Sequence, residues 1–315
     1  MVNGAQERTR RTAEGVSLQG RDGARLHAEL LLPEGEPRAA VALSHAMMVD
    51  RRTLDQPPGE GLLSQLLAAG AAVLWFDQRG HGKSGPLAQT GASWDYDALV
   101  DDAGVVAAYL KGRFPQLPCV AVGHSLFGHV ALAWQARASA PWWESGPNGA
   151  GVARYDALVL LGANVWLPQL EPVRVRWWAK RLTFLALEAS SVGRGYLPVR
   201  RLRLGTADEP YEYLRQMGGW LADADWTARD GQSYLRALPC VDVPILSVAS
   251  VGDRLLAIPE CQGQLAGMTR GPVSHITVGY AHGDGCQPDH MGLVLDARMV
   301  GVWRRMGAWI CGLGR

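Results

Sequence analysis

A serine stands between two runs of different periodicity in CVAVGHSLFG, residues 119–128. The apolar run before it predicts a buried strand, and the run after it predicts a helix. At such a turn Ser125 would be lifted above the carboxyl edge of a sheet, where the N-terminus of the following helix supplies N–H groups and a positive dipole. Gly123 provides the small residue that this turn needs two positions before the serine. These features favour a nucleophile.

One position of this motif departs from the G-x-S-x-G pattern. Phe127 stands where the second glycine is usual, and Gly128 follows one position later. A turn serine without chemistry is therefore the alternative interpretation of Ser125.

A serine hydroxyl needs a base to take its proton and a carboxylate to hold that base. In a strand–serine–helix arrangement both lie downstream, in the order Ser, acid, His. Asp253 ends the strand-like VPILSVASVGD, which would put its carboxylate at the same sheet edge as Ser125. Asp242 precedes that strand and is the weaker candidate. Two histidines follow, His282 in YAHGDG and His290 in PDHMGLVLDA, and the residues alone leave both open as the base.

The loop ALSHAMMVDRRTLD, residues 42–55, follows another strand-like run and can aim a backbone N–H at the serine. Met47 is the preferred donor, with Ala46 next. We expect His45 to be structural. His124 should point to the opposite side of its strand from the serine and is expected to be structural as well.

Strand-like and helix-like segments alternate along most of the chain. VSLQG and LHAELLLP predict an opening hairpin, and the later segments predict a mostly parallel sheet covered by helices on both faces, an α/β fold. The stretch 165–238 is rich in Trp and Arg and offers only helical or irregular patterns. We therefore predict a core formed by residues 1–164 and 239–315, with 165–238 inserted as a helical cap over the strand ends.

The composition bears on which classes of partner the protein could bind. The chain has 315 residues, 48% hydrophobic and 19% charged, with a formal net charge of +1, which gives no general attraction to nucleic acid or membrane. No run approaches the roughly 20 apolar residues of a membrane span, and the N-terminus lacks the apolar stretch of a signal peptide, so we expect a cytoplasmic protein. The five cysteines form no CxxC pair, and their odd number argues against a disulfide framework or a zinc site.

Five segments in this order resemble the α/β-hydrolase fold family: SHAMM, WFDQRGHGKSG, GHSLFG, SVGDRLL and DHMGLVL. The chain is most similar to the predicted esterase/lipase groups labelled serine-aminopeptidase-like or monoglyceride-lipase-like. GYLPVRRLRLG, residues 195–205, is also similar to the cap of a predicted-hydrolase subgroup whose catalytic histidine lies in a Gly-His-x-Gly-like motif. Asp289-His290-Met291-Gly292 matches that motif with Asp for the first Gly, so the resemblance favours His290; the insert AHGDGCQP before it departs from the family.

The resemblance implies acyl transfer through a serine ester, with no metal or organic cofactor. Ser125 would attack a carbonyl, His290 would act as base and then acid, and Asp253 would orient it. The N–H groups of Met47 and Leu126 would stabilise the oxyanion.

The substrate is expected to be a small molecule, largely apolar, bound under the cap. Residues that could line its pocket are Ala46, Trp166, Trp177, Trp178, Trp220 and Trp226, although tryptophans at helical spacing also pack cap against core. Arg200, Arg201 and Arg203 could hold an anionic group or form a solvated face. The sequence leaves a homodimer through the last helix open. Alternatives are a thioesterase, peptidase, lactonase or acyltransferase with the same triad, and a non-catalytic binding protein on a hydrolase scaffold.

Overall fold

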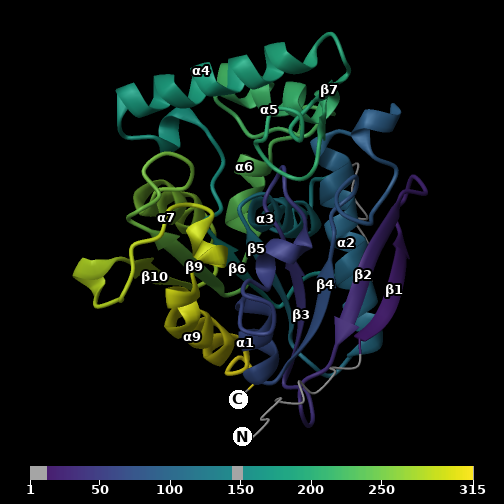
Figure 1. Cartoon of the computed structure of the whole chain (residues 1–315), viewed down its shortest axis with the longest axis vertical. Coiled ribbons are helices and arrows are strands. Elements are labelled where there is room, and N and C mark those ends of the chain that lie inside the picture. Colours follow the sequence, from purple (N-terminus) through teal and green to yellow (C-terminus); the bar gives the residue numbers. More distant parts are fainter. Residues whose placement is uncertain (1–12, 144–151, 315) are drawn as a thin grey trace, which may run out of the picture.

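Eight strands form one sheet at the centre of the protein (Figure 1). The computed structural model describes residues 13–143 and 152–314; the N-terminal residues 1–12, in which we expected no signal peptide, lie outside the described residues. The strand order is β1-β2-β4-β3-β5-β6-β9-β10. The strands are β1 (Ala13–Gln19), β2 (Arg25–Leu31), β3 (Ala39–Ser44), β4 (Ala71–Phe76), β5 (Cys119–His124), β6 (Ala157–Leu161), β9 (Ile245–Ser250) and β10 (Val273–Val278).

The predicted hairpin and the predicted parallel sheet are both confirmed. β2 pairs antiparallel with β1 and with β4. The neighbouring strands in the remaining order β4-β3-β5-β6-β9-β10 all pair in parallel. All residues of β3, β5, β6 and β9 are buried. Such continuous apolar strands are typical of a parallel sheet with both faces covered.

Side chains of successive residues in β5 enter two separate cores. Cys119 and Ala121 belong to one apolar cluster, and Val120 and Val122 belong to the other. This follows from the period-two alternation of a strand. Helices α2 (Tyr96–Arg113), α3 (Leu126–Ser139) and α7 (Pro259–Gly267) contribute to the first cluster; α1 (Leu62–Ala68), α8 (Gly292–Leu295) and α9 (Val300–Ile310) contribute to the second.

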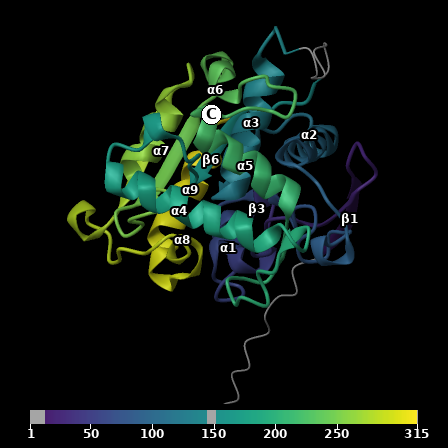
Figure 2. The ribbon, with the colours of Figure 1, turned by 90° about the horizontal axis from the view of Figure 1, so that it is seen from above.

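The cap segment, residues 165–238, lies beyond the carboxyl ends of the strands. It contains α4 (Arg174–Ser191), α5 (Tyr211–Asp223), α6 (Tyr234–Ala237) and a two-stranded ribbon of β7 (Tyr196–Leu197) and β8 (Glu209–Pro210). Seen from above, α4 crosses the molecule with α5 beside it (Figure 2). The expectation of helical and irregular structure alone missed this ribbon, because strands of two residues have no detectable periodicity. The exact boundaries of the cap segment stay a prediction.

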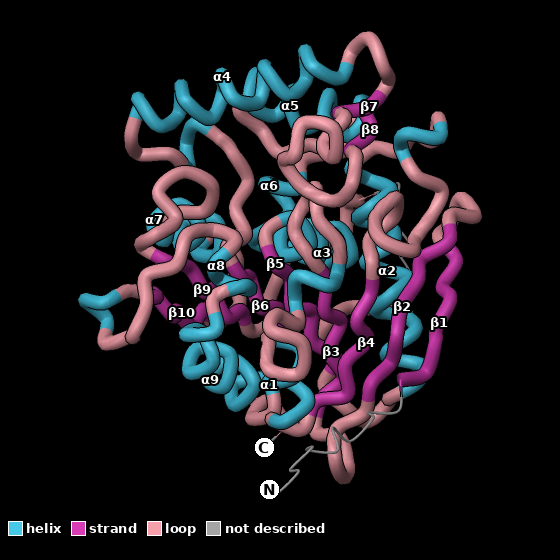
Figure 3. The backbone as a smooth tube through the Cα atoms, in the orientation of Figure 1, coloured by secondary structure: helices cyan, strands magenta, loops and turns pink. Residues whose placement is uncertain are grey.

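Loops, together with α5 and α6, lie between the sheet and α4 (Figure 3). Short 3₁₀ helices lie in these and other connections, at Arg51–Leu54, Ala88–Thr90, Pro168–Leu170, Leu238–Cys240, Tyr280–His282 and Ala297–Met299. Within residues 13–143 and 152–314, no helix combines the length and the apolar character needed to cross a bilayer.

Candidate active site

Ser125 occupies a sharp turn between β5 and α3. Its backbone has φ 51° and ψ −109°, a left-handed φ that non-glycine residues rarely adopt. The Ser125 N–H donates to the carbonyl oxygen of Leu161 at 2.9 Å, which anchors the turn to the end of β6. A strained serine at the end of a buried strand is the geometry of a nucleophile elbow.

Two glycines allow the backbone to close around this turn. A Cβ atom at Gly123 would clash with the backbone of Gly128. A Cβ atom at Gly128 would lie 2.5 Å from the Cβ of Ala163 and 2.8 Å from the Gly123 carbonyl oxygen. The close approach therefore falls at Gly128, and the position of Phe127 has room for a side chain. The Phe127 ring is buried edge-on against Phe76, with centroids 5.0 Å apart.

The predicted acid and base are paired. His290 Nδ1 lies 2.6 Å from Asp253 Oδ2, and both side chains are largely buried. A carboxylate only accepts hydrogen bonds, so Nδ1 carries a proton and Nε2 is the nitrogen left to act as a base. The first choices from the sequence are thus in contact. The weaker candidates lie elsewhere: Asp242 pairs with Arg270 on the surface, and His282 is exposed.

Backbone N–H groups also donate to the carboxylate of Asp253. Leu256 donates to Oδ1 at 2.8 Å and Ala257 donates to Oδ2 at 2.9 Å. Burial by itself would raise the pKa of Asp253, but the hydrogen bond and charge of His290 and these backbone donors together hold that pKa below its usual value. Asp253 is therefore a carboxylate under all but strongly acidic conditions, as an orienting group must be.

His290 is held beside the nucleophile elbow by contacts that sequence reasoning missed. His124, directly before the serine, lies 3.1 Å through its Nε2 from the carbonyl oxygen of His290, and the two rings are 5.0 Å apart. A Cβ atom at Gly162 would lie 3.5 Å from the His290 ring, and Gly162 follows Leu161, which anchors Ser125. These contacts bring the histidine loop to the serine turn.

Ser250 links the loop after β9, which carries Asp253 (the acid loop), to the loop that carries His290 (the histidine loop). Its hydroxyl donates to the Pro288 carbonyl oxygen at 2.6 Å and accepts from the N–H of Gly252 at 3.0 Å. No local sequence pattern predicts this role of Ser250, because it resembles any other small residue of a buried strand.

The loop after β3 is fixed by His45. Its Nδ1 donates to the Ala46 carbonyl oxygen at 2.8 Å, and its Nε2 accepts from the N–H of Gln78 at 3.1 Å. Burial, with the positive charge of His81 second, lowers the pKa of His45 to about 3, so the ring is neutral and can serve both bonds. The Ala46 carbonyl and the Met47 N–H belong to one planar trans peptide and point in opposite directions. His45 therefore sets the direction of the Met47 N–H.

Leu126 is the first residue of α3. The first four N–H groups of a helix have no acceptor within the helix, and the positive end of the helix dipole lies there. The Leu126 N–H is thus available to an anion formed at Ser125.

The predicted pocket tryptophans have different environments. Trp220 is 1% exposed and packs edge-on against Tyr96, with centroids 4.7 Å apart, in a cluster that also holds Trp226. That places Trp220 in the packing between cap and core. Trp166 is partly buried and its indole N–H donates to the Leu256 carbonyl oxygen at 2.9 Å, beside the acid loop.

The other two tryptophans lie on α4. Trp177 is partly buried against the apolar core, whereas Trp178 is 50% exposed with Arg181 over its ring.

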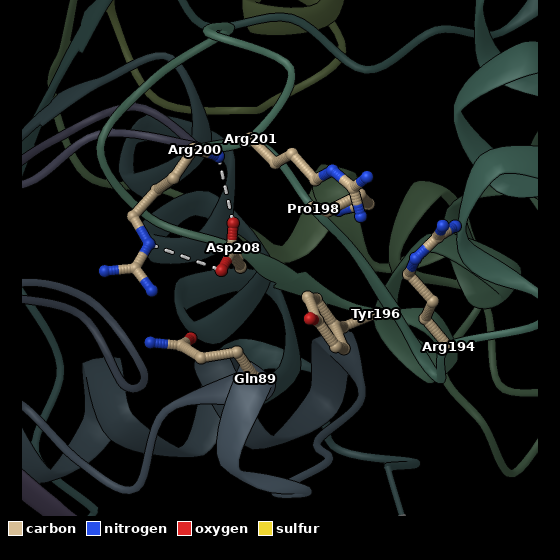
Figure 4. A pocket seen from close by; sticks show the side chains of 7 residues that line it. All are labelled: Gln89, Arg194, Tyr196, Pro198, Arg200, Arg201 and Asp208. Atoms are coloured by element: carbon tan, nitrogen blue, oxygen red, sulfur yellow. Dashed lines mark hydrogen bonds and ion pairs between the residues drawn. The ribbon is translucent and has the colours of Figure 1, made fainter.

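Arginines of the predicted basic run line a cavity of about 540 Å³ on the cap segment (Figure 4). Asp208 binds the backbone N–H of Arg200 at 3.0 Å and its guanidinium at 3.4 Å. The charge of Arg200 is therefore offset, while Arg201 and Arg194 line the cavity from its other side. Arg203 is not among the lining residues.

Comparison with known proteins relates this arrangement to hydrolases. A family model described as serine aminopeptidase, S33, matches residues 35–196, just over half of the chain. The monoacylglycerol lipase of Mycolicibacterium smegmatis (strain ATCC 700084 / mc(2)155) is 27% identical over 158 residues, which is 50% of this chain and 54% of that protein. The chain thus spans about half the length of this curated relative.

Solved structures are similar over nearly the whole chain. The esterase EaEST from Exiguobacterium antarcticum has a TM-score of 0.59 at 17% identity, covering 94% of this chain and 99% of its own. The highly thermostable carboxyl esterase from Bacillus coagulans, solved in complex with glycerol, has a TM-score of 0.61 at 16% identity, covering 96% and 99%. At these identities the likeness shows the fold, which is the α/β-hydrolase fold.

Proposed function

Because the chain belongs to the serine aminopeptidase, S33 family of hydrolases, we propose that it cleaves carboxylic esters of small to medium, largely apolar substrates through an acyl-enzyme. The observation that carries the proposal is the contact of 2.6 Å between His290 and Asp253 beside a strained serine turn. A carboxylate-held imidazole next to a nucleophile elbow is the arrangement that activates a serine hydroxyl.

In the proposed reaction the Ser125 oxygen attacks the ester carbonyl carbon while His290 Nε2 takes its proton. The negative charge on the carbonyl oxygen is stabilised by the N–H groups of Met47 and Leu126. The tetrahedral intermediate then expels the alcohol, which receives the proton from His290, and Ser125 is left acylated. Water then attacks the acyl carbon while His290 takes one of its protons. The bond between that carbon and the Ser125 oxygen breaks, the oxygen receives the proton from His290, and the carboxylic acid is released.

Support for an ester substrate comes from the relatives. The curated relative is named a monoacylglycerol lipase, and the structural neighbours are named esterases. The mechanism as written needs no metal or organic cofactor.

The binding-protein alternative rested on Phe127 distorting the elbow. Since the close backbone approach falls at Gly128, Phe127 no longer argues for a distorted turn. A thioesterase, peptidase, lactonase or acyltransferase with the same triad stays the second candidate.

The test compares kcat/KM for p-nitrophenyl butyrate and octanoate with that for an acyl-CoA thioester, a lactone and an aminoacyl p-nitroanilide. We expect the p-nitrophenyl esters to be preferred, and Ser125→Ala to lower their turnover by at least about 10⁴-fold. Preference for the thioester, lactone or anilide would transfer the proposal to that class. A folded wild type that turns over none of them would support the binding-protein alternative.

A further inference from the structure

Met48 follows the proposed oxyanion donor Met47. Its backbone N–H and its carbonyl oxygen both form hydrogen bonds with the cap segment. Its N–H donates to Glu209 Oε1 at 2.6 Å. Its carbonyl oxygen accepts from the N–H groups of Thr206 at 2.7 Å and Ala207 at 3.0 Å. Met48 itself has φ 65°, a left-handed conformation that a methionine does not adopt without external support.

The segment Gly205–Glu209 fits closely against this loop. A Cβ atom at Gly205 would clash with the Met48 carbonyl oxygen, so only glycine allows the approach. The hydroxyl of Thr206 donates to Asp50 at 3.1 Å, two residues further along the same loop. The cap segment thus contacts the loop after β3, which carries Met47 (the oxyanion loop), at both Met48 and Asp50.

Glu209 also reaches the loop after β4. Its Oε1 lies 3.0 Å from His81 Nε2, and the Nδ1 of His81 lies 2.8 Å from the Arg79 carbonyl oxygen. Both partners only accept hydrogen bonds, so both nitrogens of His81 carry protons and the pair is ionic. Burial would lower the pKa of His81, but the charge and hydrogen bond of Glu209 outweigh it and raise that pKa.

His81 in turn packs against His45, with ring centroids 5.0 Å apart. His45 fixes the peptide that carries the Met47 N–H, and Glu209 fixes the next peptide through the Met48 N–H. The two peptides on either side of Met47 are therefore both held, one by the core and one by the cap.

The carboxylate of Glu209 is only partly satisfied, because both of its contacts are made by Oε1. Glu209 is 0% exposed, and its Oε2 has no hydrogen-bond partner among residues 13–143 and 152–314. An unsatisfied buried oxygen costs free energy.

We infer that Glu209 is a positioning residue through which the docked cap segment holds the Met47 N–H in the direction required of an oxyanion donor. This inference rests on the proposed function and extends it: the oxyanion hole is complete only while residues 205–209 of the cap segment lie against the loop after β3. Glu209 touches no reacting atom and acts through Met48.

The test uses Glu209→Ala and Glu209→Gln in the full chain, with Glu171→Gln as the matched control. Glu171 is also a cap carboxylate, 2% exposed in its side chain, but it pairs with Lys180 at 2.8 Å and not with the oxyanion loop. The readouts are kcat and KM for p-nitrophenyl butyrate and the inhibition constant of a trifluoromethyl ketone, which forms a tetrahedral oxyanion on the serine.

For Glu209→Ala we expect kcat to fall about 10- to 100-fold with KM within about threefold, because misplacing a catalytic group by about 1 Å has an effect of this size. The affinity for the ketone should fall in parallel. Glu209→Gln keeps an acceptor for the Met48 N–H and should recover much of both, whereas Glu171→Gln should leave both within about threefold of wild type. If Glu209→Ala does not fold, Gly205→Ala disturbs the same loop at the Met48 carbonyl oxygen and should give the same loss.

A folded Glu209→Ala or Gly205→Ala variant whose kcat and ketone affinity match those of Glu171→Gln would overturn the inference. A wild type without ester turnover would instead overturn the proposed function, so the two failures are distinguishable.

Discussion

His290 Nδ1 and Asp253 Oδ2 lie 2.6 Å apart although 37 positions separate the two residues in the chain. The short contact fixes the tautomer of the histidine, because the carboxylate can only accept.

Asp253→Asn should therefore lower kcat by about 10⁴-fold while leaving the protein folded. The amide NH₂ of asparagine favours a hydrogen bond to an unprotonated Nδ1, which would place the imidazole proton on Nε2, where it cannot take the serine proton. The measurement is kcat for p-nitrophenyl butyrate, with Asp242→Asn as control because Asp242 lies on the surface beside Arg270. Equal rates in the two variants would refute the role of Asp253.

The nucleophile turn should tolerate a change at Phe127 but not at Gly128. Phe127→Leu keeps an apolar side chain against Phe76 and should cost less than about 1.5 kcal/mol of unfolding free energy, with activity retained. Gly128→Ala places a Cβ 2.5 Å from that of Ala163 and should abolish turnover. Urea unfolding and ester kinetics measure both, and an active Gly128→Ala variant would contradict this account of the elbow.

Buried histidines should make the fold sensitive to acid. Burial lowers the pKa of His129 to about 3, and its Nδ1 lies 2.8 Å from the Tyr96 hydroxyl; His45 and His124 also have a pKa of about 3. A group whose pKa is lower when folded takes up a proton on unfolding, so its contribution is complete above about pH 6.5 and is lost as the pH falls toward 3.

The measurement is the free energy of unfolding of wild type and His129→Gln at several values between pH 5 and 7.5. Below about pH 6 the wild type should lose about 1.4 kcal/mol per pH unit more than the variant. His81, with its raised pKa, has the opposite sign: its contribution is present below pH 6.5 and is lost as the pH rises through its folded pKa. Parallel curves for wild type and His129→Gln would show that His129 does not titrate as described.

Substitutions of Trp220 and Trp178 should distinguish a role in packing from a role in substrate binding. Trp220 is buried in an aromatic cluster, so Trp220→Ala should cost about 3–5 kcal/mol of unfolding free energy. Trp178 is half exposed, and Trp178→Ala should change stability by less than about 1 kcal/mol. A Trp220→Ala variant with unchanged stability and a raised KM would instead assign Trp220 to the substrate pocket.

Local pattern was sufficient to predict the parallel sheet and to place Asp253 at its carboxyl edge, whereas the choice of His290 over His282 came from the family resemblance. Buried strands have continuous apolar runs, and a parallel sheet brings the residues after its strands to one edge. The placement of Met47 in the loop after β3 follows from the same rule.

Contacts without a local pattern could not be predicted. Glu209 meets Met48 across 161 positions and His81 across 128, and His124 meets His290 across 166. Nothing in the neighbouring residues distinguishes a buried cap carboxylate from a solvated one. The room for a side chain at Phe127 was equally hidden, since it depends on the distance between the backbones of Gly123 and Gly128.

Labelling with a fluorophosphonate, followed by mass mapping of the modified peptide, tests the central claim most directly. Wild type, Ser125→Ala and His290→Ala would be labelled in parallel, with each variant checked for folding by circular dichroism. The account predicts one adduct on Ser125 in the wild type, none in Ser125→Ala and strongly slowed labelling in His290→Ala. A folded wild type that stays unlabelled, or an adduct that persists in Ser125→Ala, would contradict it.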